Sequence, residues 1–174
     1  NVLEPAFPGF VEFNEHPTHD DVVRIDIIES GSPYLTGVLD SDDDPQWWLE
    51  GSSYPIRVLD KEKVRVLITS RELGEKYGEE PVAVVFNFGK GEVFHMISHY
   101  FLQRAEFRNT RHQKTAASYA ADKGVPFDKP MADMASDLYL YEVEAAATSS
   151  RMFANIASEK KRRFLEEQRR RQQD

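Results

Sequence analysis

Short runs in which apolar and polar residues alternate occupy much of the first 100 residues, and this pattern is typical of β-strands. Alternation with a period of two puts one face of a strand in a core and the other in water. The clearest runs are VVRIDII at 22–28, YPIRVLD at 54–60 and KVRVLITS at 63–70. Prolines interrupt the apolar clusters before them, so residues 1–20 are predicted to form an irregular lead-in.

Two longer apolar runs, PVAVVFNF at 81–88 and EVFHMIS at 92–98, flank the tripeptide Gly89-Lys90-Gly91. Glycine adopts positive φ at little cost, and a tight hairpin turn requires such a residue. We therefore predict a β-hairpin over these runs. The preceding segment, 71–81, is rich in glycine and glutamate and is predicted to be a polar connector.

A helical period replaces the alternation towards the C-terminus. From near Met131, apolar residues recur mostly at every third or fourth position, which places them on one face of a long helix. They are Met134, Leu138, Tyr141, Ala145, Met152 and Ile156. The stripe thins beyond Ile156, so the last turns are predicted to project from the domain or to pack on a partner. The expected organisation is an α/β domain over 1–130 and a long C-terminal amphipathic helix with a basic tail over 131–174.

Charge is unevenly distributed along the chain. The formal net charge is −8, and residues 1–60 carry thirteen Asp or Glu against two Arg, whereas 159–174 carry seven Lys or Arg against four acids. Phosphate binding needs clustered positive charge, so we expect no nucleic-acid partner for this acidic body. The basic tail is expected to be a solvated helix end, with an anionic partner as the alternative.

Composition sets further bounds. The 174 residues and 40% apolar content are those of one ordinary domain. No apolar run approaches the ~20 residues of a membrane span. The chain has no cysteine, which excludes disulfides, thiolate zinc sites and a cysteine nucleophile within it and leaves the compartment undetermined. It begins at Asn1, and we expect it to be a piece of a longer protein.

Residues 32–100 resemble the C-terminal half of a class I glutamine amidotransferase-like domain, closest to its trehalose-utilisation branch. The matching residues are SPYLTGV at 32–38, Tyr54 after an aromatic stretch, VRVLITS at 64–70, and PVAVVFNFGKGEVFHMISH at 81–99. In the last of these, a strand, a GKG hairpin, a second strand and a terminal His follow one another. The resemblance implies a layered α/β sheet of the flavodoxin-like or glutamine amidotransferase-like type, incomplete in this chain.

The departures from the family bear on chemistry. The family's cysteine nucleophile has no counterpart, and His99 is not followed by Glu two residues later. Ser52 and Ser53 stand where an acidic pair often precedes the tyrosine of that branch. The strands that would carry the nucleophile are also expected to be absent. The resemblance therefore implies a degenerate member, or one half of one.

Histidines supply the candidate reactive groups. His99 ends the second strand of the predicted hairpin, where ligands of open α/β sheets gather, and is the candidate catalytic residue or metal ligand. A capping role at the sheet edge is the alternative. His95 shares its face of the strand but lies about 13 Å away, too far to share one metal. His16, His19 and Asp20 are candidate metal ligands, although polar loop residues around Pro17 are the simpler interpretation.

An aromatic group at Trp47, Trp48 and Tyr54 is the candidate ligand- or partner-binding surface, because carbohydrate sites and protein interfaces both use such rings. Core packing is the alternative. Adjacent residues of a strand point to opposite faces, so at least one of the two indoles is expected to meet a loop, a partner or solvent.

Two functions follow from these patterns. The first is a noncatalytic interaction or scaffold domain that uses its C-terminal helix to bind a protein partner or to form a homo-oligomer, without a cofactor. The second is a hydrolase, or a metal- or carbohydrate-binding domain, with its site near His99.

Overall fold

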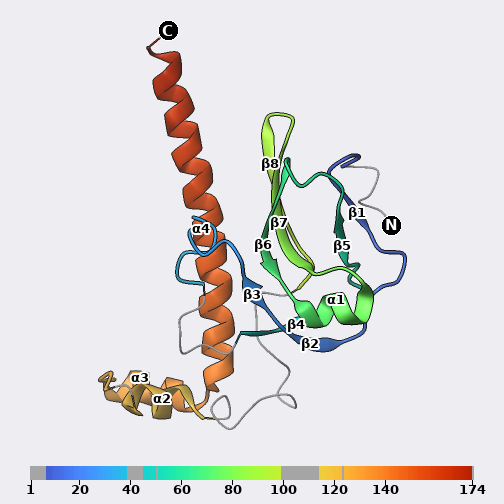
Figure 1. The fold of residues 1–174 in the computed structure, drawn as a ribbon. Helices are drawn as coiled ribbons and strands as arrows, with labels where there is room; N and C mark the ends of the chain where they lie inside the picture. Colours follow the sequence, from blue (N-terminus) through green and yellow to red (C-terminus); the bar gives the residue numbers. More distant parts are fainter. Residues whose placement is uncertain (1–6, 39–44, 50, 99–113, 123, 174) are drawn as a thin grey trace.

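The computed structural model describes residues 7–38, 45–49, 51–98, 114–122 and 124–173 and mixes small antiparallel sheets with helices (Figure 1). A strand-rich body lies beside a long C-terminal helix, and two short helices pack near the beginning of that helix. The predicted α/β class, with an incomplete sheet, a β-hairpin and a long C-terminal helix, is confirmed.

The largest sheet has four strands in the order β3-β6-β7-β8, and every neighbouring pair is antiparallel. Its strands are β3 (Asp26–Ile27), β6 (Val64–Thr69), β7 (Pro81–Phe88) and β8 (Gly91–Met96). The central strand β7 is buried from Val82 to Phe86, which agrees with its continuous apolar run. Because consecutive residues of a strand point to opposite faces, both faces of β7 are buried there.

Two smaller sheets complete the body. β1 (Val11–Phe13) pairs with β5 (Ile56–Val58), and β2 (Asp21–Arg24) pairs with β4 (Gln46–Leu49), both antiparallel. The prediction that 1–20 is wholly irregular was wrong, because Val11 and Phe13 alternate with Glu12 and bury their side chains in the core.

The predicted hairpin is confirmed between β7 and β8. Phe88 pairs with Gly91, which leaves Gly89 and Lys90 as a two-residue loop. Gly89 has φ of 60°, the sign that the first loop position of a type II′ turn requires.

Helix α1 (Arg71–Tyr77) occupies the segment predicted to be a polar connector. The hydroxyl of Ser70 caps it by accepting a hydrogen bond from the Leu73 amide, and Gly78 ends it in the left-handed conformation. Leu73 is fully buried and fixes the helix against the body. The short length of the segment hid a helix whose two caps are both present in the sequence.

The long helix begins later than predicted. α2 (Ala116–Asp122) and α3 (Lys129–Ser136) are separate short helices, and α4 runs from Leu140 to Arg171. The Leu140 amide donates to the Lys114 carbonyl, and the Ala116 amide donates to the Leu138 carbonyl. This pairing holds the chain extended around Tyr139 and interrupts the stripe that indicated one helix from Met131.

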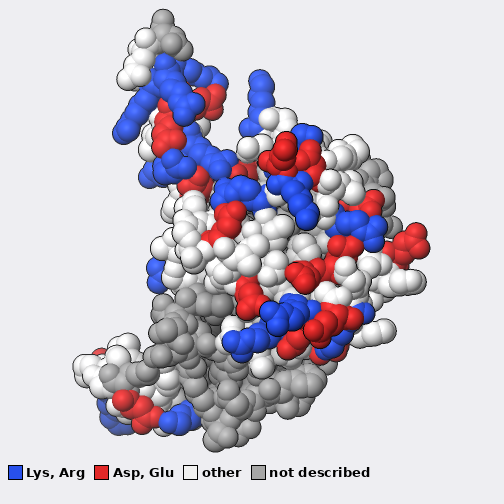
Figure 2. Space-filling model, viewed as in Figure 1, with Lys and Arg blue, Asp and Glu red and all other residues white. Residues whose placement is uncertain are grey.

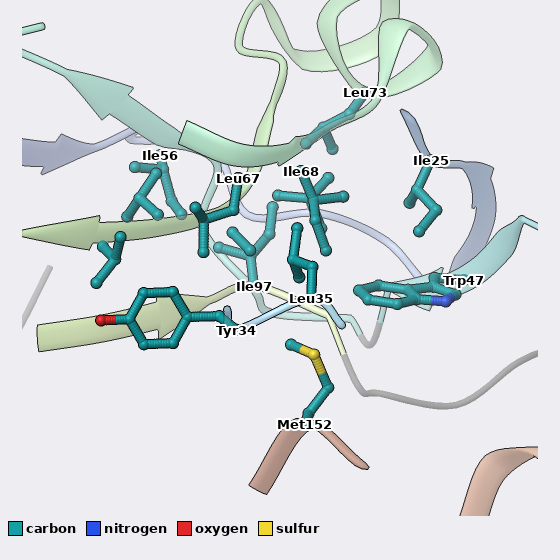
Figure 3. Close-up of a cluster of buried hydrophobic side chains, with 14 of the residues drawn as sticks. Ile25, Tyr34, Leu35, Trp47, Ile56, Leu67, Ile68, Leu73, Ile97 and Met152 are labelled. Carbon is teal, nitrogen blue, oxygen red and sulfur yellow. The ribbon is translucent and has the colours of Figure 1, made fainter. Parts of the chain in front are cut away.

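One core joins the body to α4. Figure 3 shows Met152 of α4 beneath Leu35, with Leu67 and Ile68 of β6 in the same cluster. Met152 has no exposed surface, and a fully buried methionine side chain contributes about 1.5–3 kcal/mol relative to an exposed one. The first half of α4 is therefore part of the folded domain.

Candidate protein-interaction site

Asn155 of α4 holds the helix to the turn that contains Tyr34 and Thr36. Its side-chain Nδ2 donates hydrogen bonds to the carbonyl oxygens of Tyr34 and Thr36, each at 2.9 Å. One amide group thereby satisfies two backbone acceptors of an irregular turn, and it fixes the position of α4 along its axis relative to the body.

A chain of polar contacts continues from Tyr34 to α4. The Tyr34 hydroxyl donates to Glu92 Oε2 at 2.5 Å, and Glu92 Oε1 lies 2.6 Å from Arg163 Nη1. Tyr34 is 1% exposed, so desolvation, assisted by the bond to Glu92, raises the pKa of its phenol well above the ordinary value. The phenol therefore stays protonated and remains a donor to the hairpin carboxylate.

Glu159 completes this network within α4. Its carboxylate accepts from Arg162 Nη2 at 2.6 Å and from Arg163 Nε at 2.8 Å, and the residue is 4% exposed. These charged donors, Arg162 first and Arg163 second, lower the pKa of Glu159 to about 2 despite its burial. The carboxylate is ionised at any physiological pH and orients both guanidinium groups.

α4 continues past these anchors. No residue after Arg163 makes a hydrogen bond or ion pair to another element within the described ranges, and the helix end extends beyond the sheet (Figure 1). Phe164 is 58% exposed and Leu165 is 44% exposed. Figure 2 shows Lys and Arg side chains gathered along this end of the molecule. The projecting end is thus both basic and partly apolar.

The face of α4 opposite Met152 is exposed along its length. We call it the outer face and define it by Val143, Ala147, Ala154, Ala157 and Phe164, all of which are exposed. Their spacings of 4, 7, 3 and 7 positions follow the 3,4 pattern of a seam along which two helices pack.

A cavity of about 350 Å³ opens where the outer face meets the short helices. α4 contributes Leu140, Val143 and Ala147 to its wall, α2 contributes Ala120, and α3 contributes Ala135. Alanine, leucine, valine and phenylalanine line the rest, with one tyrosine. Such a wall suits an apolar side chain better than a charged ligand.

The predicted catalytic candidate, His99, lies outside the described residues. His95 of β8 pairs with Val84 of β7. Its ring packs edge-on against the ring of Phe13, with 5.1 Å between the ring centroids. Burial lowers the pKa of His95, and its Nε2 has no hydrogen-bond partner among the described residues. His95 is thus a partly buried residue whose ring packs against Phe13.

The predicted metal ligands His16, His19 and Asp20 lie in a loop between β1 and β2. Within the ranges that the structure describes, no three His, Asp or Glu side chains are grouped so that they could hold a metal ion. Asp20 accepts a hydrogen bond from the Gly51 amide at 2.5 Å, and the His19 amide donates to the Tyr77 hydroxyl. These bonds tie the loop to the body.

His16 instead borders a polar hollow of about 270 Å³ beside Glu12 and Arg57. Arg57 pairs with Glu12 at 2.8 Å and with Glu79 at 2.6 Å, so two carboxylates already balance its charge. Among the described residues that line the hollow, the arginine therefore offers an anion no uncompensated charge.

The predicted aromatic surface is divided between the core and the exterior. Trp47 is fully buried opposite Val23, whereas Trp48, opposite Val22, is partly buried at the edge of the core. Tyr54 is 37% exposed. Trp47 is therefore a packing residue that cannot meet a ligand in this conformation, whereas Trp48 packs partly buried against the core.

The chain gives no significant match to a protein-family model, to a curated protein or to a solved structure. Among the described helices, none combines the length and apolar character needed to cross a membrane.

Sequence reasoning anticipated the buried stripe through Met152 and Ile156 but missed the anchors around it. Tyr34, Glu92 and Arg163 are far apart in the chain, and no local pattern connects them. The apolar cavity was missed for a related reason, because its walls come from three helices. The exposed Phe164 and Leu165 did have a signal, since both interrupt a basic tract.

Proposed function

We propose that this chain is a noncatalytic interaction or scaffold domain, in which the α/β body holds α4 in place and α4 binds a protein. The partner is another protein or a second copy of the chain. One observation carries the proposal: α4 runs on to Arg171 after its last anchor, Arg163, with two large apolar side chains exposed just beyond it.

The energetics of helices support this interpretation. A helix segment without tertiary contacts is marginal in water, because nucleation and backbone ordering oppose it. Ion pairs such as Arg171 with Glu167 contribute only a few tenths of a kcal/mol each. A projecting end that also exposes Phe164 and Leu165 gains most from burial against a partner.

The resemblance to glutamine amidotransferase-like domains is part of the proposal, with this chain as a degenerate member. The absence of cysteine from these 174 residues supports a noncatalytic role. Among the described residues, His95 is the histidine nearest in sequence to the candidate His99. Its ring packs against Phe13, and no described carboxylate forms a hydrogen bond or an ion pair with it.

Binding experiments with two chains test the proposal: the full chain and one shortened after Arg163, which keeps every anchor to the body. We expect the full chain to self-associate or to retain a protein from a lysate of its source cells, and the shortened chain to do neither. A well-folded full chain that does neither would contradict the proposal. So would turnover of a small amide, ester or glycoside that His99→Ala abolishes without unfolding the protein, because that result supports a hydrolase.

A further inference from the structure

We infer that the partner of α4 is a second copy of this chain, and that the two α4 helices pack antiparallel along their outer faces. Phe164 of each copy then lies against the apolar cavity of the other. The inference rests on the proposed function and specifies its partner and geometry.

Charge complementarity favours this occupant. The segment from Asp128 to Glu144, which contains α3 and the start of α4, has five acidic residues against Lys129. The segment from Glu159 to Arg171 has seven basic residues against three acidic ones. Lys160, Lys161, Arg169 and Arg170 have no ion-pair partner within the described ranges. A second copy of the chain offers an acidic segment to the basic end of α4 and a basic segment to its acidic beginning.

The direction of packing follows from the same distribution. Parallel helices would place the basic end of one copy beside the basic end of the other, and like charges repel. Antiparallel helices place each basic end beside the acidic beginning of its neighbour, and they also oppose the two helix dipoles. The antiparallel arrangement is therefore the one that the charges stabilise.

The apolar groups on the outer face set the register. Antiparallel packing with Ala154 beside Ala157 of the second copy brings Phe164 of one copy level with Ala147 of the other, because residue numbers at one level have a constant sum. Ala147 is part of the cavity wall. Within one chain, Phe164 lies about 26 Å along the helix from Ala147, so it cannot fill its own cavity.

The same register pairs Ser150 of one copy with Lys161 of the other. Both residues are exposed in the single chain. In a parallel dimer, Ser150 would instead lie beside Ser150 of the second copy, about 16 Å from Lys161. A disulfide forms only when the two Cα atoms come within about 7 Å, so it distinguishes the two arrangements.

The test uses the full chain, which has no cysteine of its own. Ser150→Cys and Lys161→Cys proteins are oxidised mildly, each alone and as an equimolar mixture, and Glu75→Cys on α1 controls for random collision. We expect a covalent dimer in the mixture and little in either protein alone. Self-linked dimers of Ser150→Cys would indicate parallel packing and overturn the inference, as would a mixture that links no more than the control.

Sedimentation equilibrium supplies an independent measure. We expect Phe164→Ala to weaken the dimer at least 10-fold, and Gln172→Ala at the helix end to leave it unchanged. Raised salt should also weaken the dimer. A monomeric mass for the full chain at all concentrations overturns the inference. It contradicts the proposed function as well only when the full chain also retains no other protein through the end of α4.

Discussion

Glu92 of the β7–β8 hairpin and Arg163 of α4 form an ion pair at 2.6 Å, and this pair marks the place where α4 leaves the body. Before it, Met152 and Asn155 connect the helix to the core and to the Tyr34 turn. After it, α4 has no polar contact to other elements within the described ranges. The hairpin therefore determines how much of α4 is fixed and how much is available for binding.

The stability of the folded chain should depend strongly on one side chain in the docked half of α4. Met152→Ala removes a fully buried methionine side chain and leaves a cavity, so we expect it to lower the free energy of unfolding by about 2–5 kcal/mol. Glu75→Ala at an exposed position of α1, away from the outer face of α4, should change it by less than about 0.5 kcal/mol. Urea denaturation measures both, and equal effects would contradict the docking of α4 on the core.

The Glu159 network gives an acid-dependent contribution. The pKa of Glu159 is lowered to about 2 in the folded chain, so the stabilisation is complete above its ordinary value near 4.5 and is lost as the pH falls towards 2. Glu159→Gln should therefore destabilise by about 1–2 kcal/mol at pH 7, and the difference from wild type should shrink between pH 4.5 and 2. Stability curves at several pH values measure this, and a difference independent of pH would refute the network's role.

His95 should make stability depend on pH near neutrality. Burial lowers the pKa of His95 in the folded chain. Below about pH 6.5 the unfolded chain therefore binds a proton more readily than the folded chain, and the free energy of unfolding decreases as the pH is lowered. His95→Phe removes the unpartnered Nε2 and the titration, and should remain within about 1 kcal/mol of wild type at pH 7. Thermal unfolding of both proteins from pH 5 to 8 would contradict this if their curves kept the same slope.

The hairpin turn offers a matched pair of glycine variants. Gly89 has φ of 60°, whereas Gly91 has no positive φ and an added Cβ there would meet only ordinary contacts. Gly89→Ala should destabilise by about 1 kcal/mol, and Gly91→Ala should be milder. Comparable losses in chemical denaturation would show that the turn conformation is not what selects glycine.

The features that the sequence predicted are those with local causes. The hairpin followed from Gly89 between two apolar runs, and the burial of Met152 followed from helical spacing. The interruption before Leu140 was not predicted, because it depends on pairing with Lys114 and Ala116 from a distant segment. α1 was missed although Ser70 and Gly78 are ordinary capping residues. Its segment was interpreted from composition alone.

The candidate site divides in the same way. The projecting helix end was expected from the thinning stripe and the basic tract, but its anchors were not. Tyr34, Glu92 and Arg163 come from a turn, a hairpin and a helix, and only the folded chain brings them together.

Hydrogen exchange of the full chain at increasing protein concentration tests the central claim most directly, because it reports burial of the end of α4 without any substitution. We predict that amides in peptides covering 160–171 become more protected as concentration rises, while those of the β7–β8 hairpin stay unchanged. Exchange from 160–171 that is equally fast at every concentration would contradict the claim that a second copy covers this helix.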